Sequence, residues 1–342
     1  MNLKTNEMID WQRLYNVSDR IWKIAPWDFM YEDELFCVKL PDDQTLYFVS
    51  VMGSEGEHFA VTVYLGEEAY WKYVDLHDNG MMGDPGKVLE INQLQLSFDN
   101  HSFLDKEDLT VIKKLGRSYG DPKEFPMFRN FKDGYFPWYL NPEEVWILSV
   151  VLEQSEEMFL RIKKGFLLPD PLDHDYLVRY TELINDKLVW QEKTIYINPP
   201  SEVFEPYKAD DKLLNRIKAL PASNQLLEFD FSLLPKPISE KKSERPHYAA
   251  FALLVDHRQG MVIGTDVFGD KYNSSQRLSQ APGILLKLLS QQKIKPKGID
   301  IIRPELYDMI GSVMDSLGIR LRLTDELPMI EEARESLFEF MD

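Results

Sequence analysis

Short apolar runs separated by turn residues mark a series of strands in the first part of the chain. Apolar residues at mostly helical spacing over residues 7–24 are followed by three strand-like runs at 35–40, 45–52 and 58–64. The segments between these runs are rich in Pro, Asp, Gly and Ser, which favour tight turns. Short turns between consecutive strands are typical of an antiparallel meander. We therefore predict an antiparallel sheet with helices for the N-terminal part.

In the last part of the chain, strands alternate with single helices. An apolar run at 249–255 ends at Asp256-His257, and a turn ending in Gly260 leads to a second strand at 261–268. The elements expected after it are helix 275–292, strand 298–302, helix 304–317, strand 319–323 and helix 328–341. Two strands joined by one helix form a right-handed parallel crossover. The pattern predicts a C-terminal α/β module of order ββαβαβα with a mixed sheet, in a chain of the α+β class.

Proline-rich segments suggest where domains begin and end. Pro169-Asp-Pro171 interrupts the pattern, and residues 235–246 form a charged segment with proline at both ends. We therefore expect an N-terminal α+β domain at 1–168 and a β-rich extension at 169–234, followed by a linker at 235–246 and a C-terminal α/β domain at 247–342.

The composition is that of a folded protein with a strong negative charge. Hydrophobic residues make up 44% and aromatic residues 12%, and the formal charge is −18. From residue 244 onward 12 Lys and Arg face 15 Asp and Glu, so most of the negative charge precedes that point. Such a charge disfavours non-specific adhesion to nucleic acid or to an anionic membrane. A protein or peptide is the expected partner, and the sequence leaves the oligomeric state open.

Two further absences point to the cytoplasm. Cys37 is the single cysteine, so no internal disulfide can form, which fits a reducing compartment. No apolar run is long enough to span a membrane, and residues 1–8 lack the apolar core of a secretory signal. We expect a cytoplasmic protein.

Several short motifs resemble bacterial domains of unknown function. The N-terminal motifs are Trp11, Ala25-Pro-Trp27, Met30-Tyr-Glu32, Val51-Met-Gly53, Gly56-Glu-His58 and Val63-Tyr-Leu-Gly66. The C-terminal block, with Leu317-Gly-Ile and Leu327-Pro before a helix, is similar to a second such domain that often accompanies the first. The resemblance supports the domain division and implies no catalytic residue.

The C-terminal strand order also looks like a reduced ribonuclease H fold. Enzymes of that fold carry one acid on the first strand, one at the end of the fourth and one on the last helix, and these acids hold two divalent cations. The candidate ligands are Asp256, Glu305, Glu331 and Glu335, with Mg²⁺ or Mn²⁺ as the metal. However, Arg303-Pro304 stands where the second acid is expected, and one strand of the meander is missing. In the alternative interpretation Asp256 starts a turn and Glu305 favours a helix N-terminus.

An aromatic stretch at 125–139 is the other feature that could carry function. Exposed, it would form a binding surface through Phe128, Tyr135 and Trp138, because aromatic clusters dominate interfaces. Buried, it would seal the edge of the N-terminal core. Two prolines and Gly134 argue against a regular element there.

Two functions follow from these features. The first is a non-enzymatic binding or adaptor protein without cofactor, which uses the aromatic stretch and the acidic N-terminal face. The second is a metal-dependent phosphodiesterase or nuclease centred on the four C-terminal acids.

Overall fold

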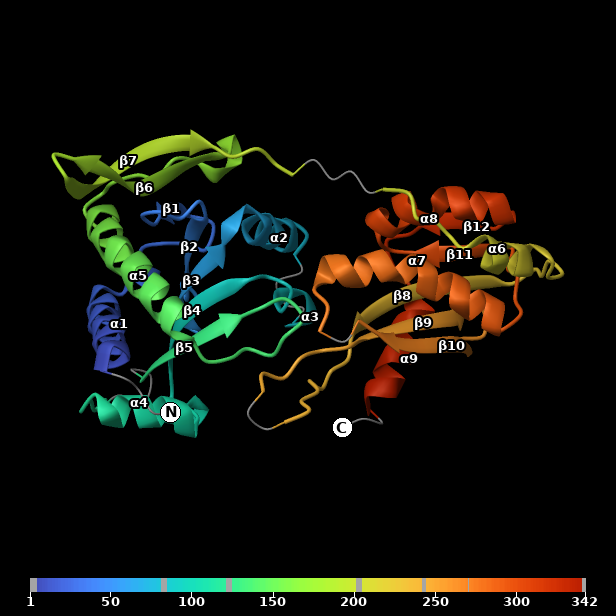
Figure 1. Cartoon of the computed structure of the whole chain (residues 1–342), viewed down its shortest axis with the longest axis horizontal. Helices are drawn as coiled ribbons and strands as arrows, with labels where there is room; N and C mark the ends of the chain where they lie inside the picture. The colour runs from blue at the N-terminus through green and yellow to red at the C-terminus, as the bar shows by residue number, and fades with distance from the viewer. Residues whose placement is uncertain are drawn as a thin grey trace. The chain divides into compact units, whose positions relative to one another are not determined.

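The computed structural model describes residues 5–80, 85–120, 125–200, 205–241, 244–269 and 271–339. The chain divides into two compact units. Unit 1 comprises residues 1–132 and 137–200, and unit 2 comprises residues 133–136 and 201–342. Each unit contains a sheet with helices packed against it (Figure 1), so the predicted α+β class is confirmed.

Unit 1 contains a seven-stranded sheet of order β5-β4-β3-β2-β1-β6-β7. All neighbouring strands are antiparallel except β1 and β6, which are parallel. The strands are β1 (Phe36–Lys39), β2 (Leu46–Met52), β3 (Phe59–Leu65), β4 (Gln93–Asp99), β5 (Phe125–Phe131), β6 (Asp175–Ile184) and β7 (Lys187–Tyr196). The predicted meander is β1-β2-β3, and β4 extends it.

Helices cover both faces of this sheet. Figure 1 shows α1 (Thr5–Ile24) beside α5 (Pro142–Ile162), on the opposite side of the sheet from α2 (Gly66–Asp78). The α1 and α5 face buries an extensive apolar core, whereas the α2 face buries several tyrosines. The remaining helical segments are α3 (Pro85–Val88), α4 (Lys106–Lys114) and the 3₁₀ turns Pro26–Asp28, His101–Phe103 and Pro171–Asp173.

The start of the aromatic stretch is a regular strand, contrary to the expectation from its prolines. β5 pairs with β4 over seven residues and lies at the edge of the sheet. An edge strand tolerates Pro126 because one side of its backbone lies outside the ladder. The main chain of Asn130 then bonds to that of Trp138 on the outer side of β5.

Unit 2 contains a five-stranded mixed sheet of order β10-β9-β8-β11-β12. β8 pairs antiparallel with β9 and parallel with β11, while β10 is antiparallel to β9 and β12 is parallel to β11. The strands are β8 (Leu226–Leu233), β9 (Ala250–Asp256), β10 (Val262–Phe268), β11 (Gly298–Ile301) and β12 (Arg320–Leu323). Strand β8 therefore supplies the strand that is missing from the predicted meander.

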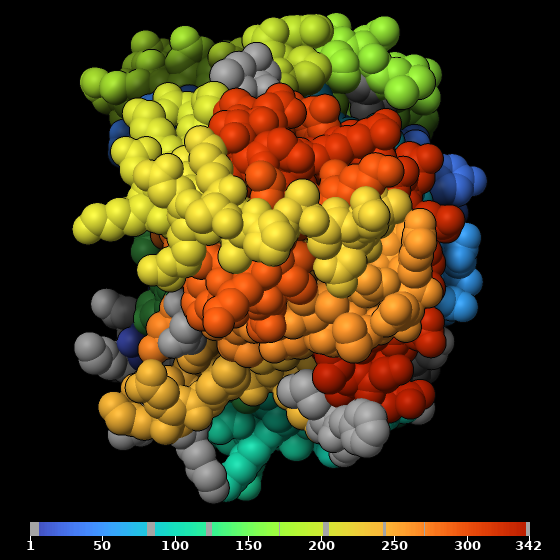
Figure 2. All heavy atoms as spheres, turned by 90° about the vertical axis from the view of Figure 1, so that its right-hand side faces the viewer, coloured from blue at the N-terminus to red at the C-terminus, as the bar shows by residue number. Residues whose placement is uncertain are grey.

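The two faces of this sheet are covered differently. Helices α6 (Asp211–Lys218), α7 (Ser274–Gln291) and α8 (Pro304–Leu317) bury an aliphatic core on one face. Helix α9 (Pro328–Glu339) lies on the other face, over β8 and β9 (Figure 1). In Figure 2, α6 lies in the yellow segment beside the orange and red segments of α7 and α8.

The predicted domain boundaries differ from this division. The expected extension at 169–234 is divided, because β6 and β7 join the sheet of unit 1 whereas α6 and β8 belong to unit 2. The expected linker at 235–246 lies inside unit 2, where it connects the neighbouring strands β8 and β9. Residues 133–136 also belong to unit 2, where Asp133 forms a buried ion pair with Arg277 (3.0 Å). Proline and charge mark this connection as irregular, but they do not reveal that β8 and β9 pair.

Across the described ranges, no helix is both long and apolar enough to cross a membrane.

Candidate functional site

Three acidic side chains lie on the α9 face of the unit 2 sheet. Along β8 the apolar residues Leu227, Phe229 and Phe231 face the aliphatic core, so the residues between them face α9. Glu228 and Asp230 occupy two of these positions, and Asp300 pairs directly with Glu228 on the neighbouring strand β11. The three are 0%, 6% and 2% exposed, respectively. We refer to Glu228, Asp230 and Asp300 as the acid cluster.

Glu228 binds the start of helix α9. One carboxylate oxygen accepts hydrogen bonds from the backbone N–H groups of Met329 and Ile330, both at 3.0 Å. The other oxygen lies 2.8 Å from Nδ1 of His257. A helix N-terminus carries unpaired N–H donors and a partial positive charge, which a buried carboxylate complements. Glu228 thus holds both α9 and the turn after β9 against the sheet.

Arginines hold the other two acids. Arg322 on β12 donates to both oxygens of Asp300, with Nε at 2.6 Å from Oδ1. Asp230 accepts from Arg303 Nε at 2.8 Å on one oxygen and from Arg334 Nη2 at 3.1 Å on the other. Each of the six oxygens of the acid cluster therefore has a donor within hydrogen-bond distance. Burying a carboxylate is costly unless it is paired in this way.

The four predicted metal ligands are not part of this cluster. Asp256 at the end of β9 accepts the backbone N–H groups of Arg258 and Gln259, both at 2.9 Å, so it shapes a turn as in the alternative interpretation. Glu305 is in the first turn of α8, and Glu331 and Glu335 are exposed on α9. Among the residues described, no group of three or more His, Cys, Asp or Glu side chains is arranged to hold a metal ion.

The three predicted binding residues lie in different environments. Phe128 is 3% exposed and packs edge-on against Trp11 and Tyr15, so it belongs to the core of unit 1 and cannot contact a partner. Tyr135 is half-buried beside His247, and Trp138 is half-buried beside Tyr139. Phe128 therefore cannot belong to the expected aromatic contact surface, because alternate residues of β5 point into the core, whereas a contact through Tyr135 and Trp138 stays a prediction.

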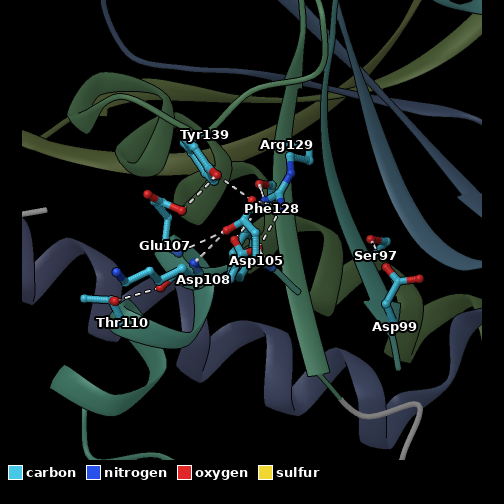
Figure 3. A network of polar contacts seen from close by, with 10 residues as sticks. Ser97, Asp99, Asp105, Glu107, Asp108, Thr110, Phe128, Arg129 and Tyr139 are labelled. Carbon is cyan, nitrogen blue, oxygen red and sulfur yellow. Dashed lines mark hydrogen bonds and ion pairs between the residues drawn. The ribbon is translucent and has the colours of Figure 1, made fainter. Parts of the chain in front are cut away.

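Tyr139 and Arg129 belong to a second polar cluster, in unit 1. Figure 3 shows both side chains pointing toward Asp105 and Asp108 at the start of α4. Arg129 binds Asp108 through two bonds of 2.8 and 2.7 Å. Asp105 and Asp108 also form the capping box of α4. The cluster fastens α4 to β5.

Burial and hydrogen bonding shift the pKa values in this second cluster in opposite directions. Burial raises the pKa of the Asp108 carboxyl, although Arg129 opposes the shift. Burial alone would also raise the pKa of Asp105, but the hydrogen bond from Tyr139 and the bonds from α4 outweigh it and lower that pKa. Burial and the bond to Asp105 raise the pKa of the Tyr139 hydroxyl. These shifts fit a fixed structural network in which both tyrosine and arginine donate.

The sequence contains a weak signal for the acid cluster. Acids alternate with apolar residues in Leu-Leu-Glu-Phe-Asp-Phe at the start of β8, and Arg320 and Arg322 alternate with apolar residues on β12. Strand alternation places each set on one face, but the pairing of Asp300 with Glu228 requires knowledge of the sheet order. Arg303, noted as standing in place of an acid, instead binds one.

Comparisons with known proteins identify families without an assigned function. Residues 11–179 match the model of a domain of unknown function (DUF7309), and residues 213–338 match that of another (DUF6930). The second match runs through residues 235–246, in agreement with unit 2. A comparison with curated proteins gives no match.

Two solved structures share a low level of similarity with the chain. They are the "Mos1 transposase paired-end complex with left transposon end" (10% identity, 56% of this chain, 60% of that chain, TM-score 0.24) and the "Crystal structure of the Mos1 Strand Transfer Complex" (10%, 57%, 66%, TM-score 0.20). The chain thus spans less than two thirds of either transposase chain, and similarity at this TM-score supports no conclusion about it. The two family matches do support a conclusion. This chain belongs to a two-domain family in which both domains are of unknown function.

Proposed function

We propose that this chain is a non-enzymatic binding protein in which the sheet of unit 2 serves as a scaffold. The supporting observation is that every oxygen of the acid cluster already has a donor from Arg303, Arg322, Arg334, His257 or the start of α9. A pair of divalent cations would need several of these oxygens as ligands. The acids would have to exchange arginines for metal, and Glu228 would have to release α9.

The contact surface in this proposal is the end of the β6–β7 hairpin. Two residues in the left-handed region, Asn185 and Asp186 (φ 49° and 58°), form the turn. The four apolar residues that flank it are all exposed, and we call them the hairpin tip: Leu183 (65%), Ile184 (40%), Leu188 (60%) and Val189 (38%).

Burial changes along the hairpin in a way that supports this choice. Tyr176 and Val178, at the other end of β6, are each 1% exposed. Leu183 and Leu188 are cross-strand partners, so they present adjacent apolar side chains on one face. Exposed apolar side chains at one end of a strand such as β6, whose other end is packed, are typical of an interaction site.

Charge indicates the kind of partner. Unit 1 carries 20 Lys and Arg against 34 Asp and Glu, a formal charge of −14. A second copy would be repelled, whereas a protein with basic residues around an apolar patch would be attracted. The proposed partner is therefore a cationic protein that buries the hairpin tip.

The test is affinity capture with the whole chain and two matched variants. Leu183→Ser with Leu188→Ser changes the hairpin tip, and Leu167→Ser with Leu172→Ser changes two leucines that are 85% and 86% exposed outside it. Both double variants should unfold within about 0.5 kcal/mol of the wild type, because surface substitutions change stability little. A captured protein is then purified, and its affinity for all three forms is measured by calorimetry.

We expect the purified partner to bind the wild type and the Leu167/Leu172 variant equally, and the hairpin-tip variant at least about tenfold more weakly. Equal affinity for all three forms would reject the hairpin tip as the contact surface. Turnover of a phosphodiester by the wild type, lost in Asp300→Asn, would reject the non-enzymatic function itself.

A further inference from the structure

Lysines alternate with inward-facing residues in the segment between α7 and β11. The sequence is Lys293-Ile-Lys-Pro-Lys297, in which Pro296 is buried and Ile294 packs against the aliphatic core. Lys293 and Lys297 are exposed, and Lys295 is half-buried. Lys293 thus lies in the turn after α7 (φ 53°), and Lys295 and Lys297 follow it on the outer side of the segment.

Main-chain hydrogen bonds place this segment at one edge of the unit 2 sheet. The N–H of Lys297 donates to Gln225 before β8 (2.9 Å), and the N–H of Arg320 donates to the carbonyl of Lys297 (3.2 Å). Lys295 forms a parallel bridge with Ala222. The starts of β8, β11 and β12 thus meet here, and we call the cations Lys293, Lys295, Lys297 and Arg320 the basic edge.

Arg258 continues the same line of positive charge. It follows His257, whose N–H donates to the carbonyl of Leu226 at the start of β8 (2.9 Å). From β9 across β8 and β11 to β12 there are three strand spacings, or about 14 Å. Cations therefore occur along about 14 Å of the edge.

The basic edge has few counter-charges. In the part of the chain that the structure describes, neither Arg258 nor any cation of the basic edge forms an ion pair. Asp256 lies at the same edge but is 6% exposed and bound to the turn. Asp315, in the last turn of α8, and Asp325, after β12, are the nearest exposed acids along the chain to Arg320. A local concentration of unpaired cations thus exists in a chain of charge −18.

We propose that the basic edge binds the phosphodiester backbone of a nucleic acid without reading its sequence. Phosphates recur every 3.4 Å or so along each strand of a duplex, and Lys and Arg neutralise them with release of counterions. Lys295 and Lys297 are two residues apart on an extended segment, or about 7 Å, which matches about two phosphates.

An acidic protein is the less favoured partner. Stable protein interfaces bury an apolar centre. At the basic edge the apolar residues Ile294 and Pro296 face inward, and the outward residues are lysines. The low overall charge of unit 2, with 19 Lys and Arg against 23 Asp and Glu, also lets a polyanion approach this unit more easily than unit 1.

The experiment measures the fluorescence anisotropy of labelled single-stranded RNA and labelled duplex DNA with the whole chain, between about 50 and 200 mM salt. Lys297→Glu with Arg320→Glu reverses two exposed cations of the basic edge. The matched control is Lys208→Glu with Lys212→Glu, which changes the net charge by the same amount. Both lysines are exposed; Lys208 precedes α6 and Lys212 lies in its first turn. Far-UV circular dichroism checks the fold of each variant, and Lys293→Ala with Lys297→Ala replaces the first variant if it does not fold.

We expect the basic-edge variant to bind at least about tenfold more weakly and the control to stay within about twofold. The slope of log Kd against log salt should fall by about 2 for the basic-edge variant on duplex DNA. The RNA and DNA arms decide which nucleic acid is preferred. The hairpin-tip variant should bind like the wild type, so this result is independent of the proposed protein partner.

Three outcomes would overturn the proposal. The first is the absence of binding by the wild type at the lowest salt. The second is an equal loss in both charge-reversal variants, which would reflect net charge alone. The third is binding of polyglutamate as tightly as of nucleic acid, which would assign the basic edge to an acidic protein.

Discussion

The two units bury their sheets in chemically different ways. In unit 1 both faces bury mainly apolar and aromatic residues, with Arg179 as a buried charge, and the α2 face is rich in tyrosine, with Phe48 stacked on Tyr70 and Tyr64 on Tyr73. In unit 2 one face is aliphatic, but the other contains the acid cluster and its arginines beside a small apolar group under α9. The first kind of face is stabilised by packing, whereas the second depends on keeping buried charges paired.

The distribution of tryptophan allows the unfolding of the two units to be followed separately. All seven tryptophans lie in the residues of unit 1, and unit 2 has none. Tryptophan fluorescence therefore reports on unit 1, while far-UV circular dichroism reports on both units. Each prediction below uses this pair of signals.

Alkaline pH should unfold unit 1 before unit 2. Burial raises the pKa of several unit 1 tyrosines, including Tyr15, Tyr64 and Tyr70, and in unit 2 that of Tyr248. A raised folded pKa stabilises the fold fully below the unfolded value of about 10 and less as pH rises through the folded value. Above pH 10, three fully buried tyrosines would together lower the free energy of unfolding by roughly 4 kcal/mol per pH unit. Fluorescence during a pH titration measures this.

Tyrosine variants sharpen the alkaline experiment. Tyr64→Phe removes one ionisable hydroxyl that is 2% exposed and should move the fluorescence midpoint to higher pH. Tyr272→Phe in unit 2, at a side chain that is 39% exposed, should leave it unchanged. Simultaneous loss of both signals at the same pH in the wild type would contradict the predicted order.

Removing one arginine from the acid cluster should destabilise unit 2 alone. Arg322→Ala leaves Asp300, which is 2% exposed, without its guanidinium. Breaking a buried pair costs about 3–5 kcal/mol, and we expect about 3 because the Arg322 side chain is 37% exposed. Circular dichroism in denaturant should show an earlier transition for unit 2, with an unchanged fluorescence midpoint.

The matching double variant separates charge from packing. Asp300→Leu with Arg322→Leu replaces the pair by apolar side chains and should recover most of the lost stability. A cost below about 1 kcal/mol for Arg322→Ala alone would mean that water screens the pair, and the contrast between the two units would be lost.

Removing a helix cap should have the smallest effect on stability, and an equal effect in each unit. Asn141 and Asn273 both form capping boxes, at the start of α5 in unit 1 and of α7 in unit 2. Alanine at either position should cost about 1 kcal/mol. Asn141→Ala should shift the fluorescence midpoint and Asn273→Ala should not; a shift in both would show that the units unfold together.

Local features of this fold could be predicted from the sequence. The capping boxes at Asp105 and Asn141 and the left-handed Gly318 (φ 69°) after α8 each depend on a few neighbouring residues, so the sequence itself indicates them. Strand β6 was not predicted, because its exposed half mixes charged and apolar residues. Strand β5 was not predicted because Pro126 argues against a strand, although a strand at the edge of a sheet tolerates proline.

Long-range features could not be predicted in the same way. The alternation in residues 226–231 indicates a strand, but nothing local places β8 between β9 and β11. The acid cluster follows from that position, since it brings Glu228 beside Asp300 and both near His257. Arg303 was read as the loss of an acid, whereas the three-dimensional arrangement makes it the partner of Asp230.

The most direct test of the account is the thermal unfolding of the whole chain with and without about 5 mM MnCl₂ or MgCl₂. A ligand that binds the folded state raises Tm, so metal binding to free carboxylates in the acid cluster would raise Tm. We expect a Tm unchanged within about 1 °C, because arginines, His257 and helix α9 already hold the acids. A rise of about 5 °C or more in the wild type that disappears in Asp300→Asn would contradict it.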